Sequence, residues 1–171
     1  MPTDSGFLEV PGGQLFYERA GQGPPVVCVH ASIVDRRMWD READVYSKTH
    51  QVVRYDLRGL GRSSAASGPF SYSADLHAVL QQLRTGPVTL VGCSVGGRIA
   101  IDFALEHPEA VRALLLVAPG LSGWTPAMDP EGQAVFDQDS VRSAELPATW
   151  FAGRHEEAVE GLLEYWCSAT K

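Results

Sequence analysis

Positive charge and cysteine are both scarce in this sequence. Lys and Arg number 14 against 21 Asp and Glu, which gives a formal net charge of −7. A chain this acidic lacks the basic surface that attracts nucleic acid, so we expect no nucleic-acid partner. The three cysteines are Cys28, Cys93 and Cys167. An odd and widely spaced set predicts neither a disulfide framework nor a metal site, and it fits a reducing compartment.

Long hydrophobic runs are also missing. No apolar stretch approaches the roughly 20 residues that a membrane-spanning helix needs. The first residues, Met1 to Asp4, do not begin the basic-then-apolar pattern of a signal peptide. We therefore expect a cytoplasmic protein without a membrane partner. Its 171 residues, 44% of them hydrophobic, suffice for one domain with a substantial core.

The most informative stretch is Gly92-Cys93-Ser94-Val95-Gly96, which follows an apolar run and precedes a helix-forming segment. This pattern predicts a strand, a very tight turn and a helix, with the Ser94 hydroxyl projecting from the edge of a sheet. A side chain at Gly92 or Gly96 would collide with the neighbouring elements. The pattern indicates a catalytic serine, and the alternative is a structural glycine turn. Cys93 occupies the flanking position, where we expect a buried and inert thiol.

Apolar runs alternate with helix-like segments along much of the chain. Ser73 is expected to cap a helix that ends at Leu83, with an apolar face toward the core. The alternation predicts an α/β fold with a mostly parallel sheet and helices on both faces. Expected strands cover residues 7–10, 14–19, 26–29, 52–55, 88–91 and 111–117, and the other expected helices cover 38–48 and 96–106.

Three polar residues each follow directly after an expected strand: His30, Asp56 and Ser94. The carboxyl ends of parallel strands meet at one edge of a sheet, which is where ligands bind in such folds. We therefore expect these three side chains to lie at the same edge.

The chain resembles the N-terminal part of the α/β-hydrolase-fold enzymes over about residues 7–120. The motifs that carry this resemblance occur in the order found in the family. They are His30-Ala31-Ser32 with Trp39 nine residues after His30, Asp56-x-Arg58-Gly59-x-Gly61-x-Ser63, Gly92-x-Ser94-x-Gly96-Gly97, and Pro108-Glu109-x-Val111-Arg112-x-Leu114.

The resemblance implies that Ser94 is the nucleophile. It also implies an oxyanion hole formed by the main-chain N–H groups of Val95 and Ser32. His30, Ala31 and Asp56 would shape the site, with His30 bracing the oxyanion turn rather than acting as a base. No cofactor and no metal are implied, and the expected ligand is a small-molecule substrate.

The resemblance further divides the chain into residues 1–121, the N-terminal part of the hydrolase core, and residues 122–171, a partial helical cap. On this interpretation the sheet is truncated before its last strands. In the family the triad acid and histidine follow the serine. Only two histidines follow Ser94 in this sequence. His107 is expected at the far end of the helix after Ser94, and His155 in an exposed segment. Asp129 is a poor candidate for the acid. The triad acid and histidine are thus predicted to be missing from this chain.

Two hypotheses follow. The first is a serine hydrolase of a small ester, thioester, lactone or similar carbonyl compound, which forms an acyl-enzyme at Ser94 and takes its acid and histidine from a complementing chain or a longer product. The second is an inactive truncated remnant or a pocket-binding module. Apolar cap residues would then favour self-association: Leu162, Leu163, Tyr165 and Trp166. A dinucleotide-binding interpretation fails, because a serine stands where that motif requires glycine.

Overall fold

The computed structural model describes residues 4–123, 130, 133, 149, 152–154 and 156–161. The chain divides into two compact units, Met1–Gly123 and Trp124–Lys171. In the second unit residues 156–161 are helical, and Arg154 pairs with Glu157 across 2.8 Å. The cap residues singled out above lie outside the described residues: Asp129, His155, Leu162, Leu163, Tyr165 and Trp166.

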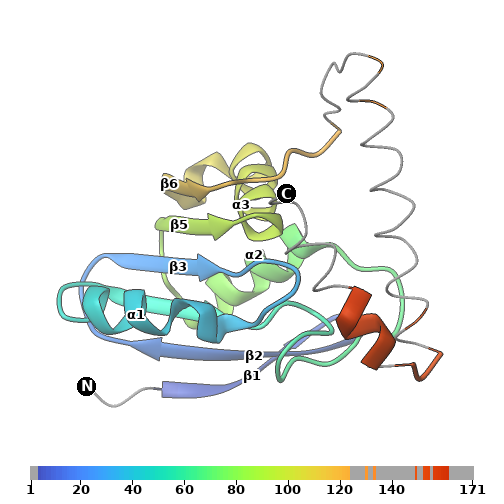
Figure 1. Ribbon diagram of the computed structural model, residues 1–171. Helices are drawn as coiled ribbons and strands as arrows, with labels where there is room; N and C mark the ends of the chain where they lie inside the picture. The colour runs from blue at the N-terminus through green and yellow to red at the C-terminus, as the bar shows by residue number, and fades with distance from the viewer. Residues whose placement is uncertain are drawn as a thin grey trace. The chain divides into compact units, whose positions relative to one another are not determined.

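The first unit contains a six-stranded sheet in the order β1-β2-β4-β3-β5-β6 (Figure 1). Its strands β3, β4, β5 and β6 are parallel to one another, whereas β2 pairs antiparallel with both β1 and β4. The predicted α/β fold with a mostly parallel sheet is therefore confirmed. The bounds are β1 (Asp4–Val10), β2 (Gly13–Ala20), β3 (Pro25–Val29), β4 (Gln51–Tyr55), β5 (Val88–Cys93) and β6 (Val111–Val117).

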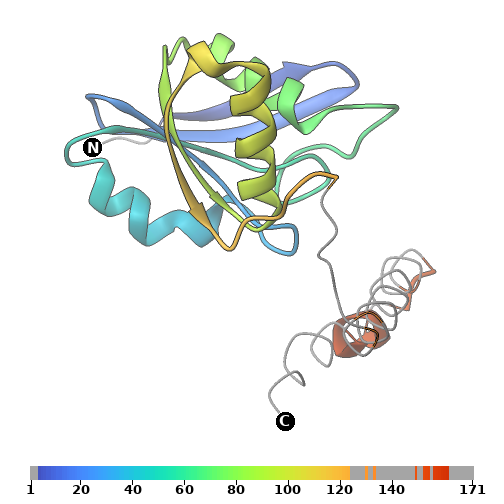
Figure 2. The same cartoon turned by 90° about the horizontal axis from the view of Figure 1, so that it is seen from above.

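Helices cover both faces of this sheet, as the alternation predicts. Helix α1 (Asp40–Tyr46), preceded by a 3₁₀ turn η1 (Arg36–Trp39), lies on one face, and α2 (Tyr72–Leu83) and α3 (Val95–Glu106) lie on the other (Figure 2). A short 3₁₀ turn, η2 (Pro108–Ala110), connects α3 to β6. Two separate apolar clusters result, because each face of the sheet buries its own side chains.

Helix α2 begins earlier than the sequence analysis predicts. The hydroxyl of Ser71, not that of Ser73, caps the helix by accepting the main-chain N–H of Ala74 at 3.3 Å. Ser73 lies inside the first turn, where its hydroxyl donates to the carboxylate of Glu106 on α3. The expected apolar face is buried as predicted, with Leu76, Val79, Leu80 and Leu83 in the core.

Strand β6 forms one edge of the sheet, and its side chains are exposed on both faces. Leu115 is 49% exposed and Val117 45%, while the alternate residues Leu114 and Leu116 are 38% and 36% exposed. Within the described residues, no strand pairs with β6 on the side away from β5. An apolar run of this kind is typical of a strand buried between two neighbours, so β6 is an edge strand with the composition of an interior one.

Candidate active site

Ser94 occupies the turn between β5 and α3 in a strained backbone conformation. Its φ of 51° and ψ of −115° lie in a region that residues with a side chain rarely adopt. Such strain persists only where the surrounding structure holds it in place. The residue is half-buried, and its hydroxyl forms no hydrogen bond with any residue in the described part of the chain. The serine is therefore placed at the carboxyl edge of the sheet, where the sequence predicts it.

The glycines around Ser94 allow three elements to approach one another closely. A Cβ on Gly92 would lie 2.4 Å from the carbonyl oxygen of Gly96. A Cβ on Gly96 would lie 2.2 Å from the carbonyl oxygen of Val29 at the end of β3. Both positions thus exclude a side chain for steric reasons, as the spacing predicts.

The two predicted oxyanion donors lie at the ends of neighbouring parallel strands. Val95 is the first residue of α3, and the first N–H groups of a helix have no intrahelical acceptor. Ser32 follows β3 in an exposed turn, and its N–H has no acceptor within the described residues. The N–H of Ala31 is directed instead to the sulfur of Met38, 3.4 Å away. The N–H of Ala31 is therefore occupied, whereas that of Ser32 is not paired within the described residues.

His30 is fully buried, and both of its ring nitrogens have partners. Nε2 accepts the main-chain N–H of Leu57 at 2.9 Å, so the proton is on Nδ1, which donates to the carbonyl oxygen of Ala31 at 2.7 Å. Burial lowers the pKa of this imidazole below its ordinary value. The ring therefore connects the turns after β3 and β4 and has no free nitrogen to accept a proton from Ser94.

Asp56 is also fully buried, and its carboxylate organises the loop after β4. Oδ1 accepts the main-chain N–H of Arg36 at 2.9 Å, and Oδ2 accepts the guanidinium of Arg36 at 2.9 Å and the N–H of Arg62 at 2.8 Å. Gly61, at φ +53°, allows the loop to wrap around it, since a Cβ there would lie 2.3 Å from Oδ2. With three donors already bound, Asp56 is not available to orient a catalytic histidine.

Arg58 from the same loop forms a bidentate pair with Asp75 on α2. The two hydrogen bonds are 2.8 and 2.7 Å long, and both side chains are almost completely buried. Sequence reasoning identified Arg58 but missed its partner Asp75, as well as Arg36, the partner of Asp56. An acidic residue in the first turn of a helix is common, so Asp75 carried no distinguishing signal.

The flanking residue Cys93 is half-buried, which corrects the prediction of a buried thiol. It packs at the margin of the apolar cluster beneath α1, because side chains alternate between the two faces of β5 and Ser94 is directed elsewhere. The neighbouring Cys28 is buried in that cluster, and burial raises its pKa to about 12. The Cys28 thiol is therefore protonated at neutral pH.

No histidine among the described residues forms a hydrogen bond with Ser94. The four described histidines are His30, His50, His77 and His107. His107 follows the last residue of α3, roughly 20 Å along the helix from Ser94 at 1.5 Å per residue, and its ring stacks on that of His77 at 4.3 Å. His155 lies outside the described residues.

Neither a metal site nor a membrane span was found in the described part of the chain. No group of three or more His, Cys, Asp or Glu side chains there is arranged to hold a metal ion. None of the described helices is both long enough and apolar enough to cross a bilayer.

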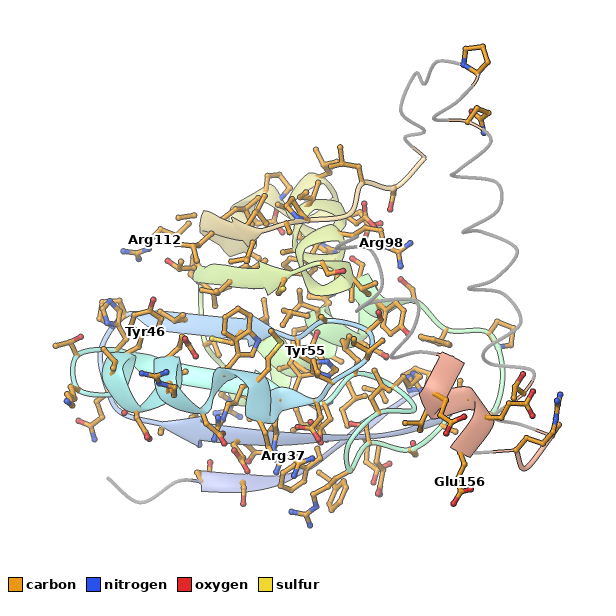
Figure 3. All side chains as sticks on the ribbon, in the orientation of Figure 1. Arg37, Tyr46, Tyr55, Arg98, Arg112 and Glu156 are labelled. Carbon is orange, nitrogen blue, oxygen red and sulfur yellow. The ribbon has the colours of Figure 1, made fainter. Side chains whose placement is uncertain are left out.

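Tyr55, at the end of β4, and Arg98, in the first turn of α3, lie toward the same edge of the sheet (Figure 3).

Comparisons with known proteins agree with this geometry. A family model described as alpha/beta hydrolase fold matches residues 24–159. A protein of Bacillus subtilis named uncharacterized hydrolase YraK is 32% identical over 120 residues, which cover 67% of this chain and 44% of the relative.

Two solved structures are similar as well. Est816, described as an N-acyl homoserine lactone degrading enzyme, is 30% identical with a TM-score of 0.67 and is matched over 83% of this chain and 55% of its own. A thioesterase domain from the curacin biosynthetic pathway is 28% identical with a TM-score of 0.65 and is matched over 80% and 52%. The chain thus spans about half the length of the proteins it matches.

Proposed function

The chain belongs to the α/β-hydrolase fold family, and we propose that it is a serine hydrolase with Ser94 as its nucleophile. The observation that carries the proposal is the strained conformation of Ser94 at the carboxyl edge of a parallel sheet, flanked by glycines that exclude any side chain. Strain of this kind concentrates at functional sites. The names of two relatives, a lactone-degrading enzyme and a thioesterase domain, favour a small ester, thioester, lactone or similar carbonyl compound as substrate.

In this proposal the Ser94 oxygen attacks the carbonyl carbon of the substrate while its proton passes to a base. The carbonyl π-electrons move to oxygen, and the N–H groups of Val95 and Ser32 stabilise the resulting oxyanion. Collapse expels the leaving group, which takes up the proton, and an acyl-enzyme remains. Water then attacks the acyl-enzyme and releases the carboxylic acid. The base and its acid partner come from residues of this chain outside the described ranges.

The test is the intact mass of the purified chain after exposure to a fluorophosphonate, with Ser94→Ala and Cys93→Ala treated in parallel. The proposal expects one adduct on the wild type and on Cys93→Ala and none on Ser94→Ala. An adduct that survives in Ser94→Ala, or no adduct on a wild-type chain with a cooperative thermal transition, would contradict it.

A specific observation supports the second candidate, a module that binds a ligand without turnover. None of the described histidines hydrogen-bonds Ser94, and serine is a weak nucleophile without a base. This candidate expects that a nonhydrolysable acyl analogue binds and raises the melting temperature, while no product forms from a panel of acyl esters. Product formation that is abolished by Ser94→Ala would rule it out.

A further inference from the structure

The chain segment after β6 holds the main chain of Ser94 on both sides. The Ser94 N–H donates to the carbonyl oxygen of Val117 at 3.0 Å. The Ser94 carbonyl oxygen accepts the N–H of Gly120 at 3.1 Å and that of Arg98 at 3.0 Å. We name residues Val117, Ala118, Pro119 and Gly120 the strap. Both peptide groups that flank Ser94 therefore have a partner in the strap.

The strap is itself under strain. Ala118 has a φ of +42°, and it lies between the two residues that bind the main chain of Ser94. Pro119 packs against the start of α3 so closely that a Cβ on Gly97 would lie 2.7 Å from the Cβ of Pro119. Residues in unfavourable regions of φ persist only where their surroundings determine them fully. The strap thus has little freedom to move relative to the turn that carries Ser94.

The Gly120 contact bears directly on the predicted oxyanion hole. The carbonyl of Ser94 and the N–H of Val95 belong to one planar peptide group, so a partner that fixes the oxygen also fixes the direction of the N–H. Two donors on the same carbonyl, Gly120 and Arg98, also polarise this peptide group and strengthen its N–H as a donor.

We propose that the Gly120 N–H is a positioning group for the oxyanion hole, because it orients and polarises the peptide group that presents the Val95 N–H. The proposal rests on the proposed function, since only a hydrolase needs this donor. Gly120 does not contact the substrate in this scheme, and its effect reaches the oxyanion through the Ser94–Val95 peptide group.

Gly120 offers a matched pair of variants. Its φ is not positive, and a Cβ would meet its nearest neighbour, the Cβ of Arg98, at an ordinary 3.6 Å. Gly120→Ala therefore keeps the N–H and fits without strain. Gly120→Pro removes the N–H at the same position. Comparison of the two shows whether replacing the N–H by the ring carbon of proline has an effect that a side chain alone does not have.

The experiment measures the rate of labelling at several fluorophosphonate concentrations. The maximal rate reports the covalent step, and the fluorophosphonate concentration that gives half of this rate reports binding. Gly120→Pro should slow the covalent step about tenfold, less than loss of a whole oxyanion donor, while the half-maximal concentration stays unchanged. Gly120→Ala should match the wild type. Equal covalent rates in all three proteins, or an equal fall in both variants, would overturn the proposal.

A second readout does not depend on activity. The amide proton of Val95 should shift upfield in the NMR spectrum of Gly120→Pro but not of Gly120→Ala, because the peptide group loses one of its two donors. An unchanged Val95 resonance in Gly120→Pro would overturn the positioning role. A wild type that gives no adduct while the resonance moves as expected would instead contradict the proposed function.

If Gly120→Pro does not fold, Ala118→Gly loosens the strap with every hydrogen-bonding group retained. It should cause a smaller fall in the covalent rate and a smaller shift of the same resonance, and no change in either would overturn the proposal.

Discussion

The imidazole Nε2 of His30 accepts the main-chain N–H of Leu57 across 2.9 Å. This bond joins the turn after β3 to the turn after β4 and fixes the tautomer of a ring that has no exposure to solvent. Since the ring accepts at Nε2 and donates at Nδ1, only its neutral form satisfies both bonds. The position of the predicted oxyanion turn is therefore tied to the protonation state of one histidine.

The first prediction concerns the dependence of stability on pH. Burial lowers the folded-state pKa of His30 below its ordinary value of 6.5, so protonation favours the unfolded chain. The contribution of His30 is complete above about pH 6.5 and is lost as the pH falls toward the folded-state pKa. Urea unfolding at pH 7.5 and 5.5 should show a loss of stability in the wild type and a smaller loss in His30→Gln. Equal losses in the two proteins would contradict the prediction.

The second prediction concerns the buried pair of Arg58 and Asp75. Asp75→Asn leaves the Arg58 guanidinium, 1% exposed, without its anionic partner. We expect the free energy of unfolding to fall by about 3 kcal/mol or more, measured by chemical denaturation. The matched control is Asp102→Asn, which makes the same change at a half-buried aspartate on α3 that accepts the exposed hydroxyl of Ser122. A loss as large in Asp102→Asn would show that burial of the pair is not the cause.

The third prediction tests the close approach of α3 to β3. Gly96→Ala would place a Cβ 2.2 Å from the Val29 carbonyl oxygen, a backbone atom that cannot rotate away. We expect a loss of about 3 kcal/mol of stability through overpacking, together with loss of Ser94 labelling. Gly68→Ala is the control, because no atom lies within 4 Å of its Cβ position and its φ is not positive. Thermal melting of both variants gives the comparison, and similar melting temperatures would count against the steric argument.

The fourth prediction concerns the edge strand β6. An exposed apolar edge is a template for pairing with another chain, so we expect the 171-residue chain to self-associate as its concentration rises. Leu115→Lys places a charge on this edge and should shift the chain toward the monomer. Leu105→Lys makes the same change at a leucine that is 79% exposed on α3, outside the strand itself, and should have no effect. Sedimentation equilibrium distinguishes the two variants, and an equal effect of both would point to net charge alone.

Features that depend on neighbours along the chain were predictable from the sequence. The turn at Ser94 follows from glycines two residues to either side, and all six strands follow from short apolar or alternating runs. The pairs Arg36–Asp56 and Arg58–Asp75 were not predictable, because each joins residues far apart in sequence that only the fold brings together.

Two further features escaped prediction for related reasons. Ser71 and Ser73 are equally good helix caps in sequence, and the choice depends on where the loop before α2 turns. The apolar run of β6 indicates burial on both faces, but exposure depends on what pairs with its outer edge, and no local pattern contains that information.

The last prediction separates the strain at Ser94 from its chemistry. With φ 51° and ψ −115°, any residue with a Cβ at this position is strained, whereas glycine is not. Ser94→Ala and Ser94→Gly both remove the hydroxyl, so both should lose the fluorophosphonate adduct. Only Ser94→Gly also removes the strain, and relief of about 1 kcal/mol or more should outweigh the extra freedom that glycine gives the unfolded chain. Urea unfolding should therefore rank Ser94→Gly as more stable than Ser94→Ala. The reverse order would mean that the turn holds Ser94 without strain, and the main structural support for its role as a nucleophile would be removed.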